Sequence, residues 1–193
     1  MRGYLLFHFH RKVQGYATDY FQYDPFIWHN PYILSFCHMN MITGRYIQKC
    51  NHPSDIVILG VTRVGGQFCC SLVFYIGDKR PLSVARATFP FAKHHFVKGE
   101  KGHYAYYHAV PEHFSLIADM DRSYIPQPAV PIEDMVNAER QRLYPKRYRP
   151  LSQSWKKRRG WIRLDPIDRL LTYVDNHAKY KHYGALPFSP LPV

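Results

Sequence analysis

The chain has 193 residues, 46% of them hydrophobic, and a formal net charge of +12. That hydrophobic content can form one ordinary core, so a single domain over residues 1–193 is predicted. The sequence contains no run of about 18 apolar residues and no apolar signal region. Neither a membrane span nor secretion is therefore indicated, and we expect a cytoplasmic location.

The four cysteines are Cys37, Cys50, Cys69 and Cys70. They show neither the CxxC spacing of a zinc site nor the density of a secreted disulfide scaffold. Free thiols in a reducing compartment are expected.

The clearest local signal is a β-hairpin between residues 56 and 75. Both of its strands are rich in β-branched and aromatic residues, and Gly65-Gly66 between them suits a two-residue turn with positive φ at both positions. Strict alternation from this turn predicts that Val61 faces Cys70 and that further pairs follow in step, with Leu59 opposite Leu72 and Val57 opposite Phe74. That face is the predicted core.

The opposite face of the same hairpin carries small residues at its outer half, namely Gly60, Thr62, Cys69 and Ser71. Glycine within a strand often marks a place where another backbone or a ligand approaches closely. The sequence therefore predicts a small-residue notch, filled by a packed helix or by a flat ligand.

Further short elements complete the predicted fold. Strands are expected at residues 3–11, 32–37, 82–91 and 103–110, a proline-rich connector begins at residue 126, and a helix covers residues 131–143. Residues 165–176 suit either a short helix or a closing strand. Short strands separated by turn signals favour an α+β domain with a curled antiparallel sheet or a small β-barrel and a few helices.

Most of the excess positive charge lies in residues 140–163, which we call the basic segment. It holds ten Lys and Arg residues and no Asp or Glu. A polyanion would be attracted to it by counterion release, and interleaved aromatic rings could stack on unpaired bases. The predicted phosphate contacts are Arg142, Lys146, Arg147, Arg149, Lys156, Lys157, Arg158, Arg159 and Arg163, and the predicted stacking residues are Tyr144, Tyr148, Trp155 and Trp161. The alternative is a solvated basic face whose aromatic residues anchor it to the core.

Signals for catalysis are weaker. The 12 histidines show no metal-binding spacing, and no metal site or cofactor is predicted. His8, His10 and Asp55 are candidate acid or base groups, and Cys69 is a candidate nucleophile for which the sequence identifies no base. The GxSxG, GxxxxGK[ST] and GxGxxG patterns are missing, which argues against common hydrolases, nucleoside triphosphatases and dinucleotide-dependent enzymes.

Several short motifs occur in an order that resembles the nucleotide-modification-associated domains of bacteria and phages. They are GYA followed by Phe21, then Cys37 and Arg45, then SDIV with Gly60, then LVFY, and finally HYG followed by a proline. The sequence departs from the family at residues 18–20 and at Ser54 and Ile56, so a ligand bound by this loop is expected to differ from the family's.

This resemblance implies a PUA-like barrel that holds a base of DNA or RNA. Tyr16, Phe21 and Trp28 would then line a pocket, with Arg45 and Asp55 making polar contacts to the base edge. Such an analogy of fold does not establish a reaction.

Together these features predict a nucleic-acid-binding domain that recognises a nucleotide or base, modified or unmodified, in a phage or bacterial modification or defence context. The alternatives are a nucleotide- or base-modifying enzyme on the same scaffold, and a basic module that binds an acidic protein partner. No membrane partner is expected.

Overall fold

The computed structural model describes residues 1–7, 32–35, 46–47, 49–81, 114–155 and 161–184. The strands within them are β1 (Arg2–Phe7), β2 (Ile33–Ser35), β3 (Ile56–Val64), β4 (Gln67–Pro81), β5 (Phe114–Ala118), β6 (Ile125–Gln127), β7 (Val130–Pro131), β8 (Trp161–Leu164) and β9 (Tyr180–His182). The helices are η3 (Pro53–Asp55), α4 (Glu133–Leu143), η5 (Pro145–Arg147), α5 (Leu151–Ser154) and α6 (Asp168–His177). The strands expected at residues 82–91 and 103–110 lie outside the described residues.

The main sheet has the strand order β2-β5-β4-β3-β1-β8, and β7 pairs with β4 beside this path. β1 runs parallel to β3, whereas the other neighbours in the sheet are antiparallel. The sheet is therefore mixed, and the prediction of an antiparallel sheet was wrong in this respect. The α+β class is confirmed.

In the described part of the chain β2 and β8 end the sheet and do not pair with each other. β6 and β9 form a separate two-stranded sheet.

The predicted hairpin is present as β3 and β4. Gly65 and Gly66 form its turn with φ values of 56° and 86°, a backbone region that costs glycine little. Val61 faces Cys70, as the sequence predicted. The turn chemistry and the register close to it are thus confirmed.

The register changes farther from the turn. An irregularity between Gly60 and Val61 shifts the pairing by one residue, so that Leu59 faces Val73 and not Leu72. Because side chains alternate between the two faces of a strand, one inserted residue moves all later side chains to the opposite face. Leu72 and Phe74 consequently belong to the other core, and their predicted pairing was wrong.

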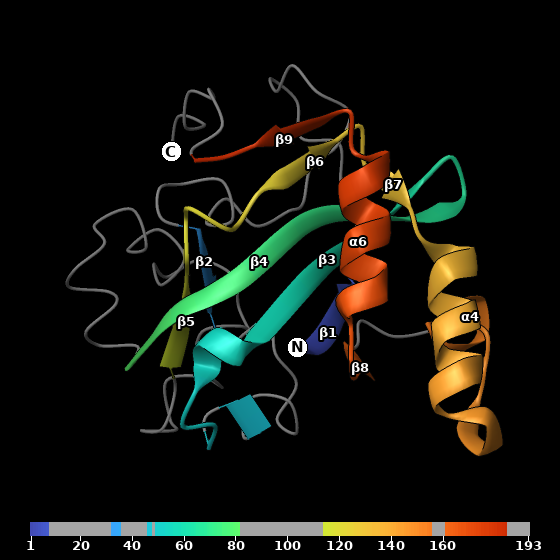
Figure 1. Ribbon diagram of the computed structural model, residues 1–193, viewed down its shortest axis with the longest axis horizontal. Coiled ribbons are helices and arrows are strands. Elements are labelled where there is room, and N and C mark those ends of the chain that lie inside the picture. The colour runs from blue at the N-terminus through green and yellow to red at the C-terminus, as the bar shows by residue number, and fades with distance from the viewer. Residues whose placement is uncertain (8–31, 36–45, 48, 82–113, 156–160, 185–193) are drawn as a thin grey trace, which may run out of the picture.

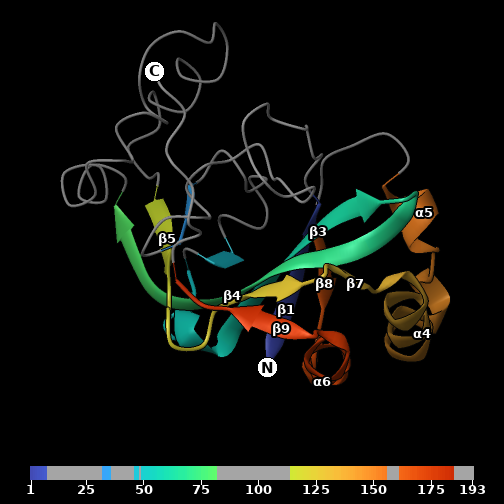
Figure 2. The same ribbon diagram turned by 90° about the horizontal axis from the view of Figure 1, so that it is seen from above.

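The sheet has a hydrophobic core on each face. One core contains Leu5, Leu59 and Val61 together with residues of α4, α5 and α6. Figure 2 shows α4 and α6 on this same side of the sheet. The second core lies on the other face and combines residues of β1, β3 and β4 with residues of β2 and β5. β1, β3 and β4 are therefore covered on both sides, which explains their nearly continuous apolar sequences.

The helix predicted at residues 131–143 forms as α4, and residues 165–176, which suited either a helix or a strand, contain most of α6. α4 has Glu133 and Asp134 in its first turn and Arg140 and Arg142 in its last, as the helix dipole favours. Residues 168–177 form a helix and not a closing strand, because α6 buries one apolar face against the sheet. No helix among the described residues has the length and apolar character needed to cross a membrane.

Glycine permits the close packing of β1 against the residues that precede α6. A Cβ atom at Gly3 would lie only 2.2 Å from Cδ1 of Ile167. The backbone of β1 can therefore approach Ile167 only because this position has no side chain. β8 pairs with β1 directly beside this contact, with Gly3 opposite Leu164.

Candidate nucleic-acid interface

A groove of about 600 Å³ lies at β8, an end strand of the main sheet, next to the C-terminal half of α4. We call it the β8 groove. Its lining joins two parts of the sequence, the end of α4 with η5 and the strand β8 with the residue after it: Arg140, Tyr144, Arg147, Trp161, Ile162, Arg163 and Asp165. All of these except Asp165 come from the basic segment.

Tyr144 ties the end of α4 to the end of β8. Its hydroxyl accepts a hydrogen bond from the Asp165 N–H at 3.2 Å and lies 3.4 Å from the Asp165 carbonyl oxygen, to which it can donate. Tyr144 also follows Arg140 by one helical turn, and its N–H bonds the Arg140 carbonyl at 2.8 Å. One side of the groove is therefore held at a fixed position relative to β8.

The arginine side chains of the groove differ in how many hydrogen bonds they already make within the protein. Arg140 donates from Nη1 to the Arg149 carbonyl at 2.6 Å and to Ser154 Oγ at 2.9 Å. Burial lowers the pKa of its guanidinium below the usual value. Arg147 is exposed and makes no side-chain hydrogen bond or ion pair with any other described residue. Arg147 is thus the cation of the groove most available to a ligand.

Arg163 is held from two directions. Its Nη2 lies 2.6 Å from Oδ2 of Asp165, and its guanidinium lies over the Tyr46 ring, 5.3 Å from the ring centroid. The hydrogen bond to Asp165 raises the pKa of Arg163. The planar guanidinium therefore has a defined orientation, with its Tyr46-facing side covered.

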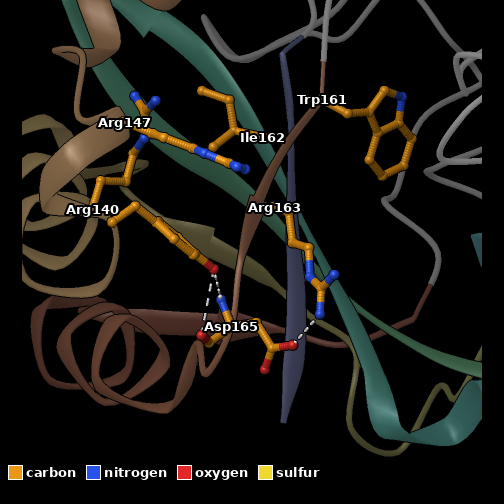
Figure 3. Close-up of a pocket in the computed structure, with 7 residues that line it drawn as sticks. Arg140, Arg147, Trp161, Ile162, Arg163 and Asp165 are labelled. Atoms are coloured by element: carbon orange, nitrogen blue, oxygen red, sulfur yellow. Dashed lines mark hydrogen bonds and ion pairs between the residues drawn. The ribbon is translucent and has the colours of Figure 1, made fainter.

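Side chains of β8 alternate between the two faces of the sheet. Figure 3 shows Trp161 and Arg163 on one side of the strand and Ile162 on the other, toward Arg140 and Arg147. Trp161 is half-buried and meets Tyr4 edge to face, with ring centroids 6.0 Å apart. Burial raises the pKa of Tyr4 to about 12. The groove thus offers an aromatic ring on each side of β8, Tyr144 on one and Trp161 on the other.

Trp155 has a different position from the one that the stacking prediction requires. It is 4% exposed and stacks on Phe7, with ring centroids 5.0 Å apart and an interplanar angle of 18°. The Phe68 ring lies 5.3 Å away. Trp155 is therefore a core residue that anchors the basic segment, and its predicted stacking on bases is corrected.

Arg142 is engaged by a buried carboxylate. Glu139 is 2% exposed and lies 2.6 Å from Arg142 Nη2 and 2.9 Å from Arg169 Nη1. A buried carboxylate requires such partners, because an unpaired charge is costly in the protein interior. Arg142 thus neutralises the Glu139 carboxylate through this ion pair. It does not line the groove.

The other predicted residues of the basic segment divide into two sets. Lys146 and Arg149 are exposed, and Tyr148 is half-buried, but none of the three lines the groove. The remaining predicted phosphate contacts, Lys156, Lys157, Arg158 and Arg159, lie outside the described residues.

The base pocket implied by the family resemblance also falls mainly outside the described residues. This applies to Tyr16, Phe21, Trp28 and Arg45, and to the candidate acid or base groups His8 and His10. Asp55 is exposed at the end of η3 and does not line the groove.

Cys69 lies in a setting that disfavours nucleophilic chemistry. Its side chain is 3% exposed, and burial raises the pKa of its thiol. Thr62, its cross-strand partner, is fully buried, and Ser71 Oγ donates to the Gly60 carbonyl at 3.3 Å. The small-residue notch is thus closed packing and not an open surface. Cys50 is half-buried, and the three described cysteines are free.

Two residues of the candidate site were not anticipated from the sequence. Tyr46 supports Arg163, and Asp165 is the single acidic residue that lines the groove. Charge counting cannot find Asp165, because it follows the basic segment by two positions and enters the groove only through the pairing of β8.

Comparison with protein-family models, with curated proteins and with solved structures finds no match for this chain. No group of three or more His, Cys, Asp or Glu residues in the described part of the chain is arranged to hold a metal ion.

Proposed function

We propose that the β8 groove binds single-stranded nucleic acid, or a base flipped out of a duplex, in DNA or RNA. The observation that carries this proposal is that arginines and aromatic rings from two parts of the basic segment line one groove. Arginine heads contact phosphates, and the faces of aromatic rings stack on unpaired bases. An exposed cation such as Arg147 suits the phosphate, and the Trp161 ring suits a base.

The biological setting and the finer fold are part of the same proposal. We propose a phage or bacterial protein of nucleotide modification or defence that acts in the cytoplasm, with a PUA-like closure of the sheet. The motif order quoted above supports this setting. A base-modifying activity and the binding of an acidic protein remain alternatives, and the second would use the same cations.

The proposal is tested with fluorescent single-stranded oligonucleotides of about ten nucleotides, titrated by anisotropy at several salt concentrations. We expect the affinity to fall steeply with salt, because each neutralised phosphate releases counterions. Arg147→Gln should weaken the binding of all sequences to a similar degree and lower the salt slope by about one unit.

Arg63→Gln is the matched control, since it removes the same charge from an exposed arginine at the hairpin, outside the groove. Its effect on binding should be small. The absence of oligonucleotide binding at low salt, or an equal loss in Arg147→Gln and Arg63→Gln, would contradict the proposal.

A further inference from the structure

We propose that Arg163 and Asp165 together recognise the Watson–Crick edge of an unpaired guanine in the β8 groove. This inference rests on the proposed nucleic-acid binding and specifies the base. Phosphate binding does not explain why an acidic residue lines this groove. Asp165 is a carboxylate among arginines, and it would repel a phosphate at its own position.

Both members of the pair remain accessible. The side chain of Arg163 is 50% exposed and that of Asp165 is 28% exposed. Their contact joins Nη2 to Oδ2, and Oδ1 of Asp165 accepts no hydrogen bond from another described residue. An ionised carboxylate has about four acceptor positions and a guanidinium has five N–H groups, so both retain hydrogen-bonding capacity.

The contact with Tyr46 does not cover the whole guanidinium of Arg163. The Tyr46 ring lies on one side of the guanidinium, with its centroid 5.3 Å from Cζ, and half of the Arg163 side chain is still exposed. The Asp165 backbone is fixed by the Tyr144 hydroxyl. The pair is thus held in place before a ligand arrives, which lowers the entropic cost of binding.

Nη2 of Arg163 contacts Oδ2 of Asp165, and Oδ1 is the other oxygen of the same carboxylate, so the pair offers a donor followed by two acceptors. This is the order that cytosine shows to guanine. The guanine edge carries the complementary order, with the O6 acceptor followed by the N1–H and N2–H donors.

The other bases fit this order less well. Adenine and cytosine each place a ring-nitrogen acceptor toward the carboxylate. Thymine and uracil can give their N3–H to Asp165, but their O2 atom opposes the second carboxylate oxygen. Guanine alone satisfies all three positions, and a guanine here would lie on the same side of β8 as the Trp161 ring.

The test uses oligothymidylates of about seven nucleotides with one central guanine, inosine, adenine or thymine, titrated at low salt. Inosine keeps O6 and N1–H but lacks the N2 amine. We expect the guanine oligonucleotide to bind about tenfold more tightly than all-thymine, with inosine in between, because one good bidentate contact discriminates at about this level.

Asp165→Asn should remove the preference for guanine over inosine and thymine, because the side-chain amide presents an N–H donor where the carboxylate accepted the guanine N1–H and N2–H. Asp121→Asn, which changes an exposed aspartate outside the groove, is the matched control and should keep the preference. If Asp165 serves only to hold Arg163, Asp165→Asn will weaken every oligonucleotide equally, and that result overturns the inference.

The wild-type comparison does not depend on the folding of any variant. Equal affinity for guanine, inosine and thymine oligonucleotides overturns the guanine assignment but leaves nucleic-acid binding intact. Failure to bind any of them at low salt overturns both proposals.

Discussion

The indole of Trp155 stacks on the ring of Phe7, with an interplanar angle of 18°. This contact joins the basic segment to β1 in the middle of the core. Trp161, six positions later, lies in β8 and lines the groove. The two tryptophans of the basic segment thus have different physical roles, one in stability and one at the surface, and substitution separates them.

Trp155→Ala should destabilise the protein by about 3–5 kcal/mol, the usual cost of removing a large buried ring. The loss comes from the cavity left between Phe7 and Phe68. Urea denaturation measures it, and Trp155→Phe should lose clearly less because it preserves most of the contact. A Trp155→Ala variant of unchanged stability would show that this indole does not pack in the core.

Trp161→Ala should instead act on binding. We expect its affinity for single-stranded oligonucleotides to fall by a factor corresponding to about 1–3 kcal/mol, the typical value for one stacked base. Trp161→Phe retains a flat ring and should recover much of the affinity. The unfolding free energy measured in parallel should change far less than in Trp155→Ala, since Trp161 is half-buried. Unchanged affinity would remove Trp161 from the proposed interface.

Elements with strong local signals could be predicted from the sequence. The Gly65-Gly66 turn and the charge distribution of α4 depend on residues close together in the chain, and both predictions were confirmed. The irregularity beyond Gly60 was missed because alternation assumes an unbroken ladder. The parallel pairing of β1 with β3 was also missed, since it joins segments about 50 residues apart and has no local signature.

The candidate site shows the same division. The basic segment was found from its composition. Composition cannot distinguish an arginine that is available to a ligand from one that forms an ion pair with a buried carboxylate. Arg142 and Arg147 look equivalent in the sequence, and only the packing of α4 places Glu139 beside the first. Burial of Trp155 likewise depends on Phe7, which lies far away in the chain.

Arg142→Gln should lower stability and leave the salt dependence of binding unchanged. The substitution removes one of two arginines that pair with the buried Glu139 carboxylate. We expect a modest loss, because Arg142 is itself solvent-exposed and Arg169 still pairs with Glu139 in the variant. Because Arg142 does not line the groove, its salt slope should match that of the wild type, in contrast to Arg147→Gln. If the oligonucleotide affinity of Arg142→Gln depended less steeply on salt than that of the wild type, Arg142 would have to contact a phosphate.

Stability should fall at alkaline pH because the Cys70 thiol and the Tyr4 hydroxyl are buried in their protonated forms. Burial raises the pKa of the Cys70 thiol from 9.0 to about 12. Above about pH 9 the thiol of the unfolded chain ionises while that of the folded protein stays protonated, so the unfolded state binds fewer protons. The free energy of unfolding must therefore decrease between about pH 9 and pH 12, and Tyr4 adds to this loss above about pH 10.

Cys70→Ala tests this assignment. Urea denaturation between about pH 8 and pH 10 should show the wild type losing up to roughly 1 kcal/mol per pH unit through this thiol, and the variant should show a flatter profile. Val61→Ala is the control, because it truncates the cross-strand neighbour of Cys70 without removing an ionisable group. It should lower stability by a similar amount at every pH and keep the wild-type slope. Equal slopes in all three proteins would mean that another group causes the alkaline loss.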